Sequence, residues 1–204
     1  MSTDNPHHIT REFESALCEY TGAPYAIAVN SCTMALLLML AWMRMEFGSY
    51  KVSVPMRTYV SVPQCVLHTG HTLHFIDLAW SGAYKLWPLP VWDCARRFTS
   101  GMYKQGQFQC VSFHASKILG DTQGGAILHD NAEADEWLRR ARFDGRTEGV
   151  APEDDRIDML GWHCYLSPDV AARLLWKLSV LPEHNTDLPN SDYPDLSTFQ
   201  IFRQ

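Results

Sequence analysis

The sequence predicts an α/β protein in which helices cover a mostly parallel central sheet. Short and almost wholly apolar runs, such as residues 25–29 (YAIAV) and 109–113 (QCVSF), have the character of strands buried on both faces. Segments with the apolar spacing of helices alternate with these runs along the chain. Such alternation is typical of βα units arranged around a parallel sheet.

The first predicted unit consists of a helix, a strand and a second helix. Residues 11–20 carry apolar side chains at helical spacing, with Thr10 as the N-cap and Gly22 at the end. Residues 25–29 follow as a buried strand. Small polar residues then lead into a strongly apolar segment, residues 34–47, which we expect to form a long buried helix.

The remaining elements continue the alternation. We expect strands at residues 51–55, 72–76, 89–92, 109–113 and 125–128, and helices at residues 60–68, 132–143 and 168–180. Ser167 is the expected N-cap of the last helix, with Pro168 at its first position. From Leu181 onward the composition changes to Pro, Asp, Asn and Ser. We therefore expect one domain, residues 1–180, followed by a surface tail, residues 181–204.

Composition limits the classes of function. The 204 residues are 46% hydrophobic and 20% charged, as in an ordinary globular protein. The net charge of −6 gives no indication of a nucleic acid partner, because phosphate binding needs a clustered basic surface. No apolar run reaches the ~18 residues that can span a bilayer, and no signal peptide is visible. We expect a cytoplasmic protein with no membrane association.

Cysteine and histidine spacing gives no metal motif. The six cysteines are scattered without a close pair, which favours reduced thiols over disulfides or zinc ligands. His68, His71 and His74 do not share one face, because the expected change from helix to strand falls between them. We therefore expect no metal.

Polar residues follow several predicted strands, at the edge where open α/β sheets bind ligands. Ser31, Cys32 and Thr33 stand between a buried strand and a helix start, where free amides favour a phosphate, although such residues also serve as simple caps. Asp93 follows another strand and is either a helix cap or the partner of a buried cation. Lys117 lies in a segment poor in other charges, where burial makes its amine a usable nucleophile, and an ordinary surface lysine is the alternative.

The segment around Lys117 resembles a known family. Residues 112–128 (SFHASKILGDTQGGAIL) are similar to the cofactor-lysine segment of the DegT/DnrJ/EryC1/StrS sugar aminotransferases. Four further segments resemble that family in the same order: residues 13–36, 54–78, 91–98 (VWDCARRF) and 161–178 (GWHCYLSPDVAARLLWKL). The matches cover about residues 13–178, and their common order makes the assignment specific.

The resemblance implies a fold and a cofactor. The fold is the three-layer αβα large domain of the fold-type I transferases, here shortened, and the cofactor is pyridoxal 5′-phosphate (PLP). By resemblance, Lys117 forms the aldimine with PLP and later serves as general base and acid. Asp93 pairs with the pyridine nitrogen, so that the ring accepts electrons from the substrate.

The resemblance also implies the residues that hold the rest of the cofactor. Ser112 and Thr33, with the neighbouring amides around Ser31 and Cys32, correspond to the phosphate site. Tyr59 matches the aromatic position that stacks on the ring.

The chain departs from the family pattern at several positions. Only fifteen residues separate Asp77 from Asp93, where family members carry several times more, and we expect the family's C-terminal domain to be missing. Arg96 replaces a glutamine that contacts the cofactor hydroxyl. It is expected to bind the cofactor's phenolate oxygen or a substrate anion, or to pair with a surface carboxylate. His163 replaces an asparagine that reaches the partner subunit's phosphate.

Three functions follow from these residues. The first is a PLP-dependent aminotransferase that moves an amino group from an amino acid donor to a keto or aldehyde acceptor, sugar-like or nucleotide-linked. Because the family builds each site from two subunits, it would act as a homodimer with shared active sites. The second is another PLP reaction on a bulky substrate, as in a decarboxylase, lyase or dehydratase. The third is a non-catalytic relic of the fold acting as a binding partner, which the joint presence of Lys117, Asp93, Ser112 and Thr33 disfavours.

Overall fold

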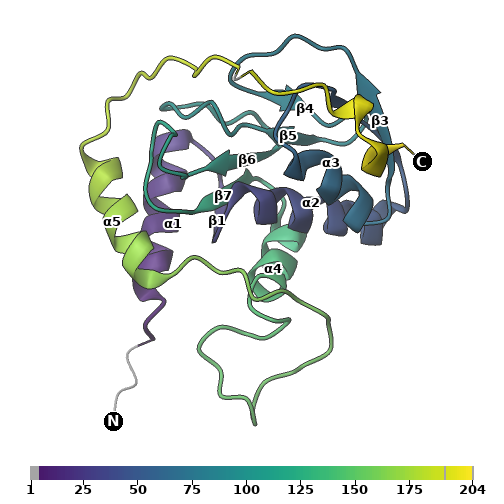
Figure 1. Ribbon diagram of the computed structural model, residues 1–204. Coiled ribbons are helices and arrows are strands. Elements are labelled where there is room, and N and C mark those ends of the chain that lie inside the picture. The colour runs from purple at the N-terminus through teal and green to yellow at the C-terminus, as the bar shows by residue number, and fades with distance from the viewer. Residues whose placement is uncertain (1–4, 191, 204) are drawn as a thin grey trace.

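A computed structural model describes residues 5–190 and 192–203, and its centre is a five-stranded sheet (Figure 1). The strand order is β1-β7-β6-β5-β4. The bounds are β1 Tyr25–Val29, β7 Gly125–His129, β6 Phe108–Ser112, β5 Val91–Asp93 and β4 Tyr84–Lys85. A separate parallel pair, β2 Lys51–Pro55 and β3 Thr72–Ile76, is linked by a bridge between Ser53 and Trp87 to the segment that follows β4.

Helices cover both faces of the central sheet, which gives the three-layer αβα arrangement. The helices are α1 His8–Thr21, α2 Cys32–Phe47, α3 Ser61–His68, α4 Ala132–Ala141 and α5 Pro168–Ser179. Along β1 the buried side chains alternate between the two faces: Ala26 and Ala28 pack under α1 and α5, whereas Ile27 and Val29 pack under α2. The α/β class is therefore confirmed.

The expectation of a mostly parallel central sheet is wrong. The pairs β1·β7, β7·β6 and β5·β4 are antiparallel, and only β5·β6 is parallel. The reason lies between β6 and β7, where residues 113–124 contain no helix, so that β7 returns directly beside β6 and lies between it and β1. Strands β1, β5 and β6 still run in one direction, so their carboxyl ends share one edge.

Most element boundaries agree with the sequence prediction to within two residues. The capping residues at the helix ends differ more from the prediction. Helix α2 begins at Cys32 because the Ser31 side chain accepts a hydrogen bond from the Met34 amide at 3.2 Å. Thr10 lies inside α1, where it is buried, and is not its N-cap. Gly22 ends α1 in the left-handed conformation, with φ 80°. Ser167 precedes α5 without a capping hydrogen bond.

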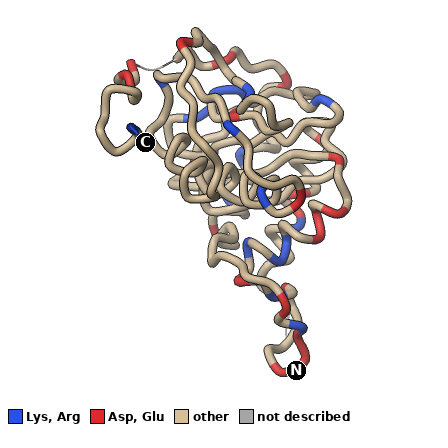
Figure 2. The backbone as a smooth tube through the Cα atoms, turned by 90° about the vertical axis from the view of Figure 1, so that its right-hand side faces the viewer, with Lys and Arg blue, Asp and Glu red and all other residues tan. Residues whose placement is uncertain are grey.

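A buried ion cluster ties α1 to β1 and α4. The Glu14 carboxylate accepts hydrogen bonds from the Ala28 amide at 2.9 Å, from Arg139 at 2.8 Å and from the fully buried Arg142. Burial alone would raise the pKa of Glu14, but the two guanidinium groups outweigh it and lower that pKa. Elsewhere, Lys, Arg, Asp and Glu are mixed along the backbone (Figure 2).

The chain beyond α5 crosses the surface toward the small parallel pair, where it ends beside β3 (Figure 1). Its first part is held by Asp187, which accepts hydrogen bonds from Nη2 of Arg97 at 2.6 Å and from its Nε at 3.0 and 3.2 Å. Its last part forms two short 3₁₀ turns, Leu196–Thr198 and Gln200–Phe202, with Leu196 and Phe202 buried. The division at residue 180 stays a prediction.

The helices of the described residues are all too short or too polar to cross a bilayer.

Candidate active site

A cavity of about 390 Å³ opens at the edge where β1, β5 and β6 end, and its size is that of a small-molecule or cofactor site. It contains eight of the nine candidate residues: Ser31, Cys32, Thr33, Tyr59, Asp93, Arg96, Ser112 and Lys117. These residues come from four separate stretches of the chain, residues 31–33, 59, 93–96 and 112–117. The shared direction of the three strands explains why polar residues far apart in the sequence meet there.

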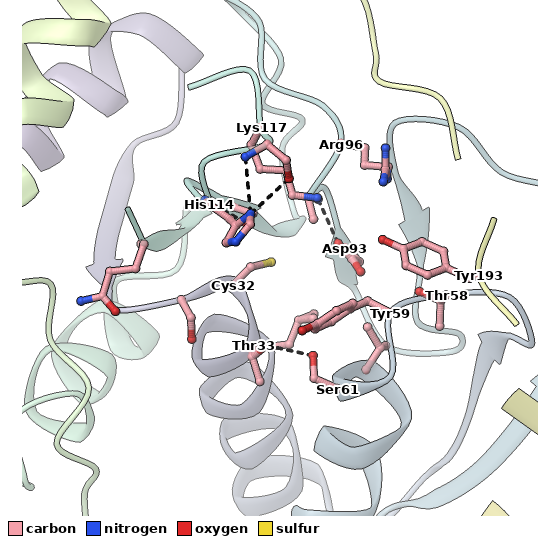
Figure 3. A pocket seen from close by; sticks show the side chains of 18 of the residues that line it. Cys32, Thr33, Thr58, Tyr59, Ser61, Asp93, Arg96, His114, Lys117 and Tyr193 are labelled. Carbon is pink, nitrogen blue, oxygen red and sulfur yellow. Dashed lines mark hydrogen bonds between the residues drawn. The ribbon is translucent and has the colours of Figure 1, made fainter. Parts of the chain in front are cut away.

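One wall of the cavity is the first turn of α2. Ser31 caps the helix, and the Thr33 hydroxyl forms a hydrogen bond of 2.8 Å with that of Ser61 (Figure 3). Gly125 lies so close to this turn that a Cβ there would stand 2.5 Å from the Cys32 nitrogen and 2.5 Å from the Ser31 carbonyl carbon. Only glycine lets β7 pack directly against the helix start, which keeps the free amides of the turn at the cavity.

Asp93 forms the floor of the cavity. Its carboxylate accepts a hydrogen bond from the Tyr84 hydroxyl at 2.7 Å and another from the Ala95 amide at 2.9 Å. The Tyr84 hydroxyl is also bonded to Thr58 at 2.6 Å. Burial raises the pKa of Asp93, although these hydrogen bonds and the nearby Lys117 oppose that effect. A cationic group in the cavity would offset the cost of this buried negative charge.

Lys117 lies in the loop between β6 and β7. Its amide donates to the His114 carbonyl at 2.8 Å, which forms a tight turn, and the His114 ring is bonded to Ser116 at 3.1 Å. The loop is fastened to α5 through the buried Asp121, which binds Arg173 at 3.0 Å and Lys177 at 2.7 Å. Those hydrogen bonds lower the pKa of Asp121, led by the one from Arg173. The Lys117 side chain thus extends into the cavity from an anchored loop (Figure 3).

Arg96 lies on the other side of the cavity and is held by the C-terminal segment. Its Nη1 donates to the Pro189 carbonyl at 2.5 Å, and its Cζ lies 5.8 Å from the centre of the Tyr193 ring. Its Nε is buried and has no hydrogen-bond partner among the described residues. Of the three roles expected for Arg96, pairing with a surface carboxylate is not what the structure shows, since the neighbouring Arg97 makes that ion pair.

His163 is the one candidate that lies outside the cavity. Its side chain is 70% exposed and its Nδ1 lies 2.7 Å from the Asp144 carboxylate. It therefore takes no part in the cavity of its own chain.

Several cavity residues escaped the sequence analysis. Thr58 and Ser61 flank Tyr59, and their hydroxyls on that short turn were a usable signal. Tyr84 is buried and holds Asp93 without lining the cavity; it has no such signal, because its hydrogen bond to Asp93 depends on the pairing of β4 with β5. Other lining residues outside the candidate set include Trp80, Gln123 and Tyr193. In the described part of the chain, no group of three or more His, Cys, Asp or Glu side chains is placed to hold a metal ion.

Comparison with known proteins shows which family has this combination of residues. The sequence profile of the DegT/DnrJ/EryC1/StrS aminotransferase family matches residues 5–83 and 94–187. The chain is 25% identical over 207 residues to a UDP-4-amino-4,6-dideoxy-N-acetyl-beta-L-altrosamine transaminase of Campylobacter jejuni, an alignment that covers 80% of this chain and 54% of that protein. The chain thus spans about half the length of this curated relative.

Solved structures with the same fold include sugar aminotransferases. AtS13 from Actinomadura melliaura superposes with a TM-score of 0.73 at 18% identity, over 85% of this chain and 60% of that one. The sugar aminotransferase CalS13 from Micromonospora echinospora gives a TM-score of 0.71 at 17% identity, over 89% of this chain and 66% of that one. The fold is therefore the fold-type I transferase fold in a shortened form. With the profile matching most of its length, the chain belongs to the DegT/DnrJ/EryC1/StrS aminotransferase family.

Proposed function

We propose that this chain binds PLP and transfers an amino group from an amino acid donor to a keto or aldehyde acceptor that is sugar-like or nucleotide-linked. The observation that carries the proposal is the meeting of Lys117, Asp93, Ser112 and the first turn of α2 in one cavity. The family supplies the reaction class, and the Campylobacter jejuni relative is named as a transaminase.

The cavity fits the phosphate of this cofactor. A helix N-terminus offers free amides and a favourable dipole to an anion. Ser31, Thr33 and Ser112 add hydroxyls at the same cavity, and Gly125 lets β7 pack against the backbone of the α2 turn that carries the first two. These residues would hold the phosphate.

The cavity also fits the protonated pyridine nitrogen. Asp93 is a buried carboxylate, and its described hydrogen-bond donors are a neutral hydroxyl and a backbone amide. A cationic nitrogen beside it would stabilise the charged carboxylate, and the carboxylate would keep that nitrogen protonated. Tyr84 and Thr58 fix the orientation of the carboxylate.

Lys117 supplies the amine that attaches the cofactor and then moves protons at the reacting carbon. PLP, when bound, supplies an electron sink for the bonds at the α-carbon of the substrate. The free Lys117 amine would accept the proton from the α-carbon of the substrate and would later donate it again. The anchored loop limits the movement of this amine, and Tyr59 closes the cavity with an aromatic face.

We propose a homodimer as the working form. His163 stands outside its own cavity, as expected for a residue that serves a partner's site, and it is exposed and oriented by Asp144. The six free cysteines fit a reducing compartment, and we propose the cytoplasm as the site of action.

The test is an absorbance spectrum of the purified chain with added PLP, before and after borohydride. Lys117→Ala is the variant, and Lys104→Ala is the matched control because Lys104 is exposed and lies outside the cavity. We expect a bound-cofactor band in wild type and control that borohydride fixes covalently on Lys117, and no such adduct in Lys117→Ala. Equal spectra for all three proteins would refute the proposal.

The product formed with an amino acid donor then distinguishes the reactions. A keto acid formed in equal amount to the aminated acceptor supports transamination. Carbon dioxide or an elimination product would assign the same cavity to another PLP reaction.

A further inference from the structure

The cavity has a second polar side that the proposed cofactor contacts do not use. Figure 3 shows Cys32 and Thr33 on one side of the cavity, Arg96 and Tyr193 on the other, and Asp93 between them. The hydroxyls and amides at the α2 turn suit the cofactor phosphate. Arg96 lies away from that turn and is free for another anion.

The charges that line the cavity leave Arg96 without a counterion. Asp93, Arg96 and Lys117 are the Asp, Glu, Lys and Arg side chains along its wall. In the proposed function Asp93 balances the pyridine nitrogen and Lys117 is attached to the cofactor. Arg96 forms no ion pair with any described residue, since its hydrogen-bond acceptor is the neutral Pro189 carbonyl. A half-buried guanidinium with donors to spare binds a carboxylate more strongly than one in open water.

The C-terminal segment fixes Arg96 in the cavity wall. The Leu188 amide donates to the Arg96 carbonyl at 2.9 Å, and Pro189 takes one side-chain donor. The segment itself is fastened before these contacts by Asp187 on Arg97, and after them by the Leu196 amide, which donates to the Met56 carbonyl at 2.9 Å. The guanidinium is therefore oriented before any ligand arrives, which lowers the entropy lost on binding.

We propose that Arg96 binds a carboxylate of the amino acid donor, and that Pro189 and Tyr193 of the C-terminal segment position it for that role. The inference rests on the proposed function, because it assigns the donor to the side of the cavity that PLP leaves open. The planar guanidinium matches a carboxylate through two parallel hydrogen bonds, which a lysine cannot reproduce. Tyr193 supports the guanidinium with its ring face.

The test measures binding of glutarate, a dicarboxylate without an amino group, to the PLP-loaded protein by calorimetry. Glutaramide is the neutral control for the ligand. Arg96→Gln should weaken glutarate binding by at least about tenfold, and Arg96→Lys should fall between it and wild type. Arg57→Gln is the matched control, because Arg57 is an exposed arginine that pairs with Asp77. It should bind glutarate as wild type does, and glutaramide should not bind measurably.

A second measurement separates this role from a contact with the cofactor. The affinity for PLP is titrated in the same variants, with thermal unfolding as a check of folding. We expect Arg96→Gln to keep its PLP affinity within about threefold of wild type. Loss of PLP affinity with unchanged glutarate affinity would overturn the inference and assign Arg96 to the cofactor. Absence of glutarate binding to loaded wild-type protein would also overturn it.

If the proposed function is wrong, the same experiments give a result that differs from failure of the Arg96 site. In that case wild type takes up no PLP, and glutarate is titrated into the unloaded protein. If glutarate binding to the unloaded protein depends on Arg96, the carboxylate site is supported and only the proposal of PLP binding is refuted. Binding that is equal in wild type and Arg96→Gln would refute the site.

Discussion

His129 makes the stability of this fold sensitive to mild acid. Its side chain is fully buried at the end of β7, stacked between the rings of Tyr25 at 5.4 Å and Phe108 at 5.6 Å. Among the described residues, neither ring nitrogen has a hydrogen-bond partner, and a carboxylate oxygen of Asp135 lies 3.7 Å from Nε2. Burial lowers the pKa of His129 to about 4, from the model-peptide value of 6.5, and Asp135 only partly opposes this.

The sign and size of the effect follow from these two values. Between pH 6.5 and pH 4 the unfolded chain binds a proton at His129 that the folded chain does not, so acid favours unfolding. The contribution is small at pH 7. At pH 5 it amounts to a loss of about 2 kcal/mol, and near pH 4 to about 3 kcal/mol, at 1.36 kcal/mol for each pKa unit.

The assay is urea unfolding of wild type and His129→Phe at pH 7 and pH 5. Phenylalanine keeps a flat ring between the two neighbours and has no group to titrate. Any packing cost is the same at both pH values, so it cancels when the pH dependence is compared. The variant should lose about 2 kcal/mol less than wild type between the two pH values.

His184→Phe is the matched control, because His184 is exposed, and it should keep the pH dependence of wild type. If His129→Phe loses as much stability as wild type between pH 7 and pH 5, the buried neutral imidazole is not the cause and the reasoning is wrong.

Three further changes test the elements that build the cavity. Gly125→Ala should destabilise the fold by about 1–3 kcal/mol in denaturant titrations and weaken PLP uptake, because the added Cβ meets backbone atoms of the α2 turn. Glu14→Gln should cost about 3 kcal/mol of unfolding free energy, because it leaves the buried Arg142 without its main counterion. Asp121→Asn weakens the anchor of the Lys117 loop. It should increase amide hydrogen exchange in residues 113–124 and slow the covalent uptake of PLP, with little change in the exchange of β1.

The sequence contains enough information for most helices and strands because their signals are local. Strands β1, β2 and β3 match the predicted ranges, since apolar alternation and flanking turns define a strand within its own residues. The direction of a strand, unlike its position, has no signal within its own residues. The return of β7 beside β6 follows from the helix-free stretch between them, which was visible in the sequence, but the usual alternation of α/β proteins outweighed it in the prediction. The two-residue β4 has no local pattern at all.

The candidate site was predictable to the extent that its residues end buried strands or form part of a recognisable motif. Asp93 and Lys117 stand at such places, and the structure brings them into one cavity. Tyr84 and Tyr193 do not. Tyr84 reaches Asp93 through the pairing of β4 with β5, and Tyr193 reaches the cavity through a segment that has no secondary structure at that point.

The C-terminal segment of the chain forms one wall of the cavity through Tyr193. The composition of residues 181–204 predicts a surface tail. The C-terminal segment instead contributes a wall from the same chain, because it holds Arg96 with Pro189 and places the Tyr193 ring 6.4 Å from that of Tyr59. Its composition of Pro, Asp, Asn and Ser is that of a solvent-exposed linker, and composition reports only the average environment of a segment. A few contacts fix such a segment once its ends are anchored, and Asp187 and Leu196 supply those anchors here.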